Sequence, residues 1–296
     1  MQEVFLALGR QWLAMALVLL ASLLLALIFL RSAPPKYTSK LLVTTTSSAS
    51  LGSSEIGGLA SLAGIGMPSS DGQVQFETFL EGLKTRETAN RLLKADPELL
   101  KRIFQAEWDD GSKQWRAPDG MLPLLAGGMK RLIGYDTGYL PPDAARLQGW
   151  LENHIEIEKA RDQRLTAIQL ETADPALGRD ILARLHEVVD GLLRQKAIER
   201  ADTSIAYLNE KLQTVTVAPY REVLVETLAA QEKKRMLAST GLPYAAEPFG
   251  PPVSGGRPTS PNPFIVILAA LVIGIALAIA TALLRERKRL FKGSGN

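Results

Sequence analysis

The sequence predicts an α+β protein in which two transmembrane helices flank a folded domain that carries a helical arm. Nearly charge-free apolar runs occupy residues 12–30 and 264–284. At about 1.5 Å rise per residue, each run forms a helix of roughly 28–32 Å, which matches the hydrocarbon thickness of a bilayer. Residues 31–263 contain no comparable run, and strand-like and helix-like patterns alternate along them. This middle stretch must therefore fold in water on one side of a membrane.

Basic residues set the orientation of the predicted spans. Arg285, Arg287, Lys288, Arg289 and Lys292 follow the second run, and positive residues beside a span are retained on the cytoplasmic side. We therefore predict that residues 1–11 and the basic tail 285–296 are cytoplasmic. The basic residues just after the first run argue mildly the other way, but the second run carries the larger bias.

The first run is predicted to be an uncleaved anchor. Its only small-residue cleavage candidate is Arg31-Ser32-Ala33, which carries a charge and is followed by Pro34-Pro35. Signal peptidase sites need small uncharged residues at such positions.

Charge and cysteine content exclude several function classes. The net charge is +3, but only 28 of the 34 basic and 29 of the 31 acidic residues lie in the nearly neutral stretch 31–263. Such a domain is a poor nucleic-acid binder, because phosphate affinity needs clustered Lys and Arg. The chain has no cysteine, which excludes disulfides, thiolate metal sites and a cysteine nucleophile.

The first part of the middle stretch predicts an α/β base. Residues 37–46 form a β-branched strand, and residues 73–105 form helix with a restart at Asp96-Pro97. Residues 47–72 are rich in Ser and Gly, but their Gly64-Ile65-Gly66 lacks the third glycine of a nucleotide loop. An Asp-Gly turn lies between Trp108 and Trp115, and the alternating stretches 154–158 and 165–172 predict a strand pair. The apolar positions of the first helical region are Phe76, Phe79, Leu80, Leu83, Ala89, Leu92 and Leu93.

The second part predicts a helical arm. Asp174-Pro175 is an N-cap followed by a first-turn proline, and it opens a long helix that ends near Ala218-Pro219. A shorter helix spans residues 220–238, and an edge strand is expected near residues 244–247. The apolar seam of the long helix repeats every three or four residues, and we expect it to mediate assembly through Ile198, Ile205, Leu208 and Leu212.

Residues 241–263 form a proline-rich lead into the second span. Proline restrains φ and lacks the amide donor, so this segment is expected to be extended and semi-rigid. Its prolines nearest the span are Pro248, Pro251, Pro252, Pro258, Pro261 and Pro263.

Small residues line one face of the second span. Ala270, Gly274, Ala278 and Ala282 recur every four residues, a spacing that lets helix backbones approach closely. Two readings stay open: this face packs against another helix, or the small residues merely reflect the composition of such helices.

The sequence offers little for catalysis. His154, Glu156 and Glu158 share a predicted strand face, and His186 lies on the long helix four residues before Asp190. We interpret both groups as polar, solvent-facing positions. No nucleophile elbow or phosphate-binding loop is present, so we predict a non-enzyme without metal or cofactor.

The order of these parts resembles the polysaccharide co-polymerases, the Wzz-type chain-length determinant family of bacterial inner membranes. Four features carry the resemblance: the strand 37–46, the helical segment 79–85, the strand and long helix over 165–189, and the C-terminal arrangement. In that arrangement, residues 232–238 lead through 243–248 and the proline run into a span with a basic end.

The resemblance implies an inner-membrane protein with a periplasmic domain over residues 31–263. It implies a base of about 37–174 and 241–250, an arm of about 175–239, and a homo-oligomeric ring. The implied role is to set the chain length, or assist export, of O-antigen (lipopolysaccharide), capsule or exopolysaccharide. The implied partners are a membrane-embedded glycan polymerase or exporter and the polysaccharide or lipid-linked glycan itself. The arm is short for the family, and the tail carries no nucleotide loop, so no fused kinase is expected.

Three alternatives remain at this stage. The chain could be the inner-membrane component of an ABC-transporter-dependent capsule exporter. A two-span periplasmic sensor is disfavoured because about a dozen residues after the second run leave no room for an output domain. An efflux-pump adaptor is disfavoured because no paired lipoyl-like motifs flank the helices.

Overall fold

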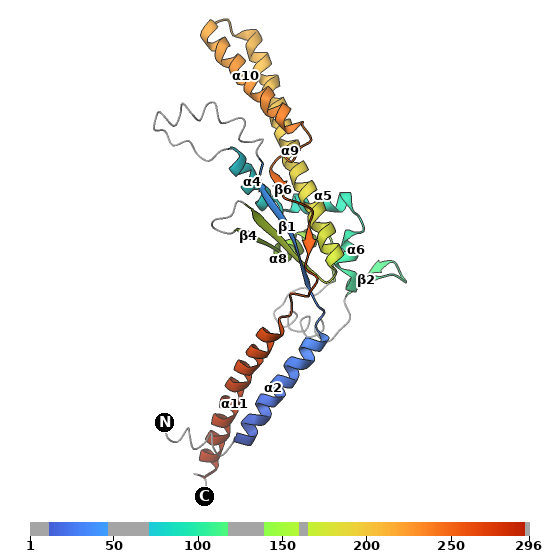
Figure 1. Cartoon of the computed structure of the whole chain (residues 1–296), viewed down its shortest axis with the longest axis vertical. Helices are drawn as coiled ribbons and strands as arrows, with labels where there is room; N and C mark the ends of the chain where they lie inside the picture. The colour runs from blue at the N-terminus through green and yellow to red at the C-terminus, as the bar shows by residue number, and fades with distance from the viewer. Residues whose placement is uncertain (1–11, 47–70, 118–138, 160–164, 294–296) are drawn as a thin grey trace. The chain divides into compact units, whose positions relative to one another are not determined.

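The computed structural model describes residues 12–46, 71–117, 139–159 and 165–293 (Figure 1). These residues form two compact units. One unit comprises residues 1–37 and 255–296, and the other comprises residues 38–254. The Ser/Gly-rich segment 47–70, including Gly64-Ile65-Gly66, lies outside the described residues.

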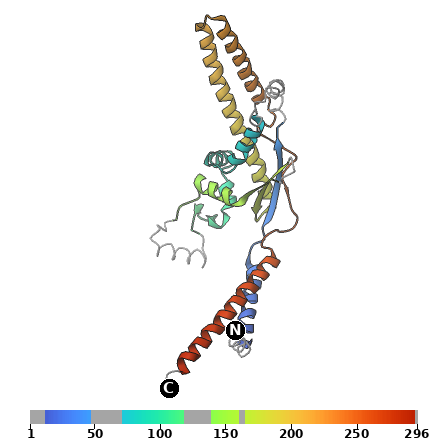
Figure 2. The same cartoon turned by 90° about the vertical axis from the view of Figure 1, so that its left-hand side faces the viewer.

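The first unit is a pair of helices, α2 (Trp12–Ser32) and α11 (Pro263–Gly293). The two helices pack side by side along their length (Figures 1 and 2). Near one end of the pair, Lys36 follows α2 and Ser260 precedes α11, and these two residues form an isolated antiparallel β-bridge. Asn262 caps the start of α11 by accepting a hydrogen bond from the Phe264 amide at 3.0 Å.

The second unit is built on one sheet with the strand order β4–β5–β1–β6, and β7 also pairs with β1. β4 pairs antiparallel with β5, and β6 and β7 each pair antiparallel with β1. A small separate hairpin joins β2 and β3. The strands are β1 (Tyr37–Thr45), β2 (Trp108–Asp109), β3 (Gln114–Trp115), β4 (Ile155–Lys159), β5 (Thr166–Thr172), β6 (Ala246–Pro248) and β7 (Val253–Ser254).

Helices lie against one face of this sheet (Figure 2). The side chains of β5 alternate between buried and half-buried along the whole strand. This alternation is expected because one face of the sheet packs against a core of helices. The helices of this unit are α4 (Asp71–Gly82), α5 (Arg86–Ala95), α6 (Leu99–Ile103), α8 (Ala144–His154), α9 (Pro175–Thr214) and α10 (Ala218–Ala238), with a 3-10 turn, η2 (Gln105–Glu107). Among them, α10 packs against α9 in the arm and not against the sheet.

The core of this base is confirmed at most of the predicted positions. Six of the seven apolar positions of the first helical region are buried, and Leu93 is half-buried against them. The base core also includes Leu41, Val43, Leu147, Leu151, Ile168, Leu170, Ile181, Leu182 and Leu185.

The helical region 73–105 is broken more often than the sequence indicated. α4 ends at Gly82, because Thr85 caps a new helix by accepting a hydrogen bond from the Thr88 amide at 3.3 Å. The expected restart at Asp96-Pro97 occurs slightly later, since α6 begins at Leu99 and Asp96 accepts a hydrogen bond from the Glu98 amide instead.

The arm follows the expected capping chemistry. Asp174 accepts a hydrogen bond from the Ala176 amide at 2.9 Å, and Pro175 occupies the first turn of α9. α9 runs without interruption from the base to Thr214 and packs against α10 beyond it (Figure 1). The interruption predicted near Ala218-Pro219 occurs between Thr214 and Ala218. Pro219 lies in the first turn of α10, where its missing amide costs nothing.

Candidate functional site

The helix pair α2–α11 is in close contact at small residues. The Ser22 hydroxyl donates a hydrogen bond to the Ala270 carbonyl at 2.6 Å. A Cβ placed on Gly274 would lie 3.0 Å from the Ser22 oxygen, so only glycine allows this approach without movement. Ala278 is buried. The structure thus brings three of the four small residues to this contact, whereas the side chain of Ala282 lies outside the described part.

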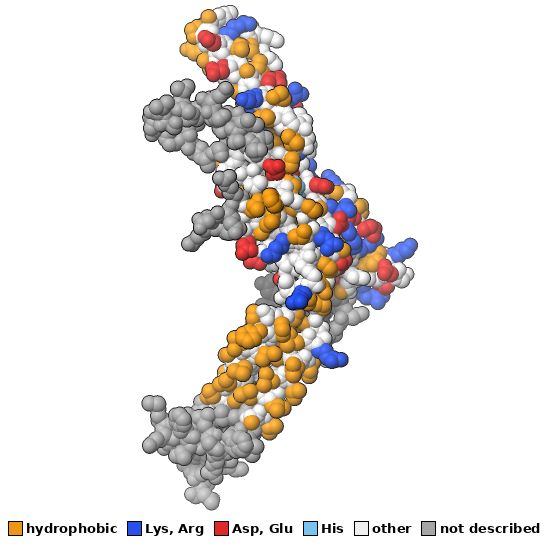
Figure 3. Space-filling view, viewed as in Figure 1, with side chains coloured by type: hydrophobic (Ala, Val, Ile, Leu, Met, Phe, Trp, Pro, Cys, Tyr) orange, Lys and Arg blue, Asp and Glu red, His pale blue; other side chains and the backbone are white. Residues whose placement is uncertain are grey.

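One described helix is long and apolar enough to cross a membrane, over Pro263–Thr281. In α2 the apolar stretch counted by the same measure, Ala16–Ser32, is shorter. Hydrophobic side chains cover the visible surface of both helices, whereas charged side chains gather on the other unit (Figure 3). Exposed apolar side chains on both helices include Leu17, Leu25, Ile28, Phe264, Ile265 and Ile273.

The proline-rich lead is partly a sheet edge. Pro248 ends β6, Pro251 and Pro252 separate β6 from β7, and Pro263 begins α11. Between them, Pro258 and Pro261 flank Ser260, whose carbonyl accepts a hydrogen bond from the Lys36 amide at 2.8 Å. The predicted edge strand at 244–247 therefore occurs one to two residues later, as β6, and β7 follows it.

The four seam residues lie on the part of α9 that packs with α10. Leu208 is 7% exposed and already covered by its own chain. Ile198, Ile205 and Leu212 are half-buried. Asp202 of α9 and Arg235 of α10 form an ion pair at 2.6 Å beside them.

A row of polar side chains on α9 holds the chain that returns from α10 to the sheet. We call His186, Asp190 and Arg194 the return clamp. The four-residue spacing places all three on one face of α9. Asp190 accepts hydrogen bonds from the amides of Tyr244 and Ala245, both at 2.8 Å.

The other two members of the return clamp extend this grip. His186 Nε2 lies 2.8 Å from the Ala246 carbonyl, and its ring packs 5.4 Å from that of Phe79. Arg194 donates to the Leu242 carbonyl at 2.6 Å and pairs with Asp190 at 2.9 Å. The expectation that His186 lies on the wet face of the helix is therefore wrong, since its half-buried ring contacts the returning chain beside Asp190, which is only 4% exposed. The signal that could have revealed them is three polar residues at fixed four-residue spacing.

His154 does not join the two glutamates on a strand face, because it ends α8 and β4 begins one residue later. Its ring stacks on Trp150, with Nδ1 2.9 Å from the Trp150 carbonyl. Glu158 accepts a hydrogen bond from Gln169 on the neighbouring strand. Among the described residues, no group of three or more His, Asp or Glu side chains could hold a metal ion.

A network of charges joins α6 to α9. Arg102 of α6 and Arg184 of α9 bind Asp180 from either side, at 2.9 and 2.8 Å. Arg102 also pairs with Asp96. Burial opposes ionisation of Asp180, but hydrogen bonds from Arg184 and Arg102 outweigh it and hold the pKa of this carboxyl below its ordinary value.

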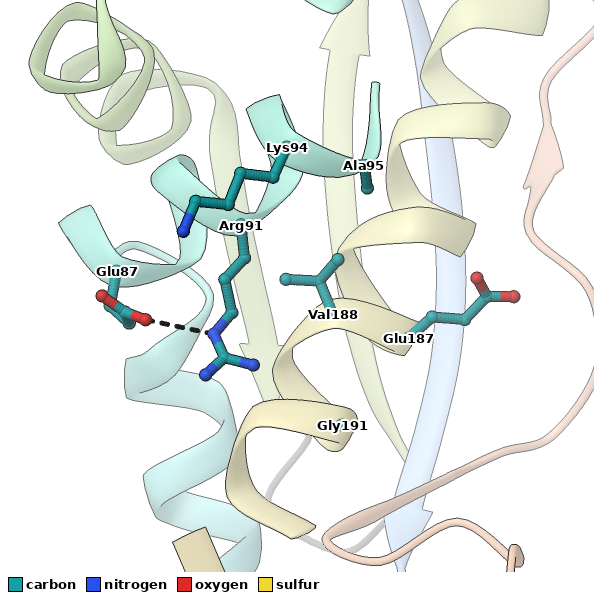
Figure 4. A pocket seen from close by; sticks show the side chains of 7 residues that line it. All are labelled: Glu87, Arg91, Lys94, Ala95, Glu187, Val188 and Gly191. Atoms are coloured by element: carbon teal, nitrogen blue, oxygen red, sulfur yellow. Dashed lines mark hydrogen bonds and ion pairs between the residues drawn. The ribbon is translucent and has the colours of Figure 1, made fainter. Parts of the chain in front are cut away.

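A groove of about 560 Å³ lies between α5 and α9 (Figure 4). Arg91 lies between the two helices, bound to Glu87 of α5 at 3.1 Å and to Gln195 of α9 at 3.0 Å. Lys94 lines the groove from α5, and Val188 and Gly191 line it from α9. This groove was not predicted from the sequence, where its one signal is a glycine inside a long helix.

The family match lies in the N-terminal third of the chain. Residues 1–101 match the family model described as Wzz, chain length determinant protein. No curated protein sequence matches the chain.

Two solved structures are similar to the chain at low identity. One is described as a full-length bacterial polysaccharide co-polymerase, with 12% identity, coverage of 98% of this chain and 99% of that chain, and a TM-score of 0.42. The other is a fragment of WzzB, a polysaccharide co-polymerase from Salmonella Typhimurium, with 13% identity, coverage of 76% and 100%, and a TM-score of 0.33. The resemblance noted in the sequence is confirmed by the family match: residues 1–101 carry the sequence pattern of the Wzz chain length determinant family.

Proposed function

We propose that this chain is a bacterial inner-membrane polysaccharide co-polymerase that regulates the chain length, and with it the export, of a cell-surface polysaccharide. The observation that carries this proposal is the match of residues 1–101 to the chain length determinant family. The matched region begins at residue 1, includes the first apolar run, and extends through β1, α4 and α5 to residue 101. The family's description is therefore tied to both the predicted anchor and the folded domain.

The proposed topology has two spans, over residues 12–30 and 264–284, with both termini in the cytoplasm and residues 31–263 in the periplasm. The close contact of Ser22 with Ala270 and Gly274 supports pairing of the spans within one chain. In a bilayer, small residues favour such pairing because they let two backbones approach. Reporter fusions at residue 150 test this topology. Periplasmic reporter activity is expected, and a cytoplasmic readout would contradict it.

The proposed mechanism is assembly rather than bond breaking. Copies of the chain form a ring that scaffolds a glycan polymerase or exporter, and the partner performs the chemistry. The half-buried Ile198, Ile205 and Leu212 retain apolar surface for contact with a neighbouring copy, whereas Leu208 acts within its own arm. The proline lead, which pairs with β1 and Lys36 before α11 begins, would couple the domain to the spans and the partner.

Electrophoresis of surface polysaccharide from a deletion strain tests the function. We expect the strain to lose its modal chain length, so that the ladder becomes a broad distribution, and a plasmid copy of the gene to restore it. A plasmid copy carrying Gly178→Leu is the negative control. A Cβ at Gly178 would lie 2.4 Å from the Ser39 oxygen, so this variant disrupts the base and should fail to restore the mode. An unchanged length distribution and amount of every surface glycan in the deletion strain would contradict the proposal.

A further inference from the structure

α9 contains two glycines, and the space around an added Cβ differs sharply between them. At Gly178 an added Cβ would lie 2.4 Å from the Ser39 oxygen and 2.6 Å from the Thr172 oxygen, so packing against the sheet requires glycine. At Gly191 an added Cβ would meet nothing within 4 Å. A glycine inside a helix destabilises it by roughly 0.5–1 kcal/mol relative to alanine. Packing within the described part of the chain therefore gives no reason for the bare backbone at Gly191.

Gly191 lines the groove between α5 and α9. Its missing side chain leaves the backbone of α9 open there, next to Val188 (Figure 4). The recess has a volume of about 560 Å³ and is open to solvent along much of its length. A backbone left bare at a recess of this size is the arrangement expected where a ligand approaches closely.

The opposite wall is polar and carries one charge without a partner. Arg91 is held by Glu87 and Gln195, so these three side chains present fixed donors and acceptors. Lys94 makes no hydrogen bond or ion pair with the described residues. Its ammonium can therefore receive an anionic group, while the Arg91–Glu87 pair can receive hydroxyls.

We propose that the groove formed by Arg91, Lys94, Val188 and Gly191 binds a carboxylate-bearing sugar unit of the polysaccharide. The inference rests on the proposed function, which supplies a glycan as the molecule that passes the domain. Lys94 binds the sugar carboxylate, the Arg91–Glu87 pair bonds its hydroxyls, and the bare backbone at Gly191 with Val188 accommodates the ring.

The charges of the lining favour a carboxylate over a phosphate. Arg91 and Lys94 are balanced by Glu87 and Glu187, so the groove has no net positive charge. Figure 4 shows that the Glu187 carboxylate is directed away from Arg91, whereas Glu87 lies beside Arg91. A singly charged sugar needs only the one free ammonium, whereas a diphosphate carries more charges than this single unpaired cation can neutralise.

Binding to full-length protein in detergent tests the site. The probes are hexagalacturonate, with a carboxylate on every sugar, and maltohexaose, a neutral chain of equal length. Wild-type protein should bind hexagalacturonate in preference to maltohexaose. Lys94→Gln should weaken that binding roughly tenfold or more, the change expected on losing one charge-assisted hydrogen bond. Gly191→Leu should weaken it by at least as much, because the leucine side chain occupies the place of the sugar ring.

Gly149→Leu is the matched control. Gly149 also lies within a helix, α8, where an added Cβ meets nothing within 4 Å, and it does not line the groove. This variant should bind as the wild type does, and circular dichroism should show all variants folded. Equal binding of the neutral and acidic probes, unchanged binding in folded Gly191→Leu, or competition by inorganic pyrophosphate as strong as by hexagalacturonate would each overturn the inference. The deletion phenotype is independent of these results, so the proposed function can survive a failure here.

Discussion

The base and the arm of the second unit use apolar side chains in different ways. In the base, Phe79, Leu83, Leu147, Leu151 and Leu185 are fully buried. In the arm beyond residue 195, Ala201, Leu208 and Ala238 are the buried apolar residues. Large apolar side chains lie exposed there instead: Tyr207, Val217, Tyr220, Val223, Val225 and Met236.

The base is therefore stabilised by its own buried core, whereas the arm depends for its stability on its links to the base. Most helix stability in proteins comes from tertiary packing, and a hairpin of two helices buries little surface. The arm is tied to the base by the continuous α9 and by the return clamp, which holds the chain after α10. The exposed apolar side chains of the arm are available to other molecules, which is consistent with a protein that acts by assembly.

The largest effect is expected in the base. Phe79→Ala should lower the free energy of unfolding by about 3–5 kcal/mol, because it removes a fully buried ring and leaves a cavity. The arm control Val223→Ala should change it by less than about 0.5 kcal/mol, since this side chain is 60% exposed. Urea unfolding of the full chain in detergent, followed by tryptophan fluorescence, measures both. Equal losses in the two variants would contradict the contrast between base and arm.

A smaller loss is expected at the return clamp. Asp190→Ala leaves two backbone amides and Arg194 without their acceptor, and should destabilise the protein by about 3 kcal/mol. Asp190→Asn keeps one acceptor oxygen and should cost less. Hydrogen exchange should show faster exchange at Tyr244 and Ala245 in the alanine variant. Unaltered exchange at these amides would mean that Asp190 does not hold the return chain.

The two glycines of α9 should respond in opposite directions. Gly178→Ala should destabilise the base by about 1–3 kcal/mol, because its Cβ overlaps the Ser39 and Thr172 oxygens. Gly191→Ala should stabilise it by about 0.5–1 kcal/mol, because alanine favours helix and meets no neighbour. Thermal unfolding of the two variants separates these effects. A loss of stability in Gly191→Ala would show that packing does require this glycine.

The smallest effect is expected in the pH dependence of stability at Asp180. The folded-state pKa of Asp180 is lowered, so its contribution to stability is present above the ordinary carboxyl pKa of about 4 and is lost as pH falls through the lower folded value. Asp180→Asn should therefore be slightly less stable than wild type at neutral pH, and the difference should vanish in strong acid. Unfolding curves at a series of pH values measure it. A difference that grows toward acid would reverse the sign of the linkage.

Local patterns in the sequence predict much of this fold. The Asp174-Pro175 cap, the period-two alternation of β5 and the Trp108–Trp115 turn depend on neighbours along the chain, and the structure confirms each. The Asp109 carboxylate within that turn accepts hydrogen bonds from Gly111 and Ser112, as a solvated turn residue does. Such features are set by backbone chemistry that a short window contains.

Long-range partners account for what the sequence could not show. His186 and Asp190 are polar residues on a helix, and only the returning chain about 55 residues later makes them a buried clamp. The groove likewise depends on α5 and α9 meeting across about 100 residues, through Arg91 and Gln195. Gly274 was singled out by its spacing, but its partner Ser22 lies 252 positions away and only the structure identifies it.

Polymerisation in membrane vesicles tests the central claim most directly, namely that this chain regulates a glycan's length without making its bonds. Vesicles from the deletion strain and from the complemented strain would receive a radiolabelled sugar precursor. Total label and polymer length would then be measured in the same samples. The account predicts unchanged total incorporation in the deletion strain, with the narrow length distribution replaced by a broad one. A complete loss of incorporation, restored by this chain, would contradict it and assign the bond-forming step to this protein.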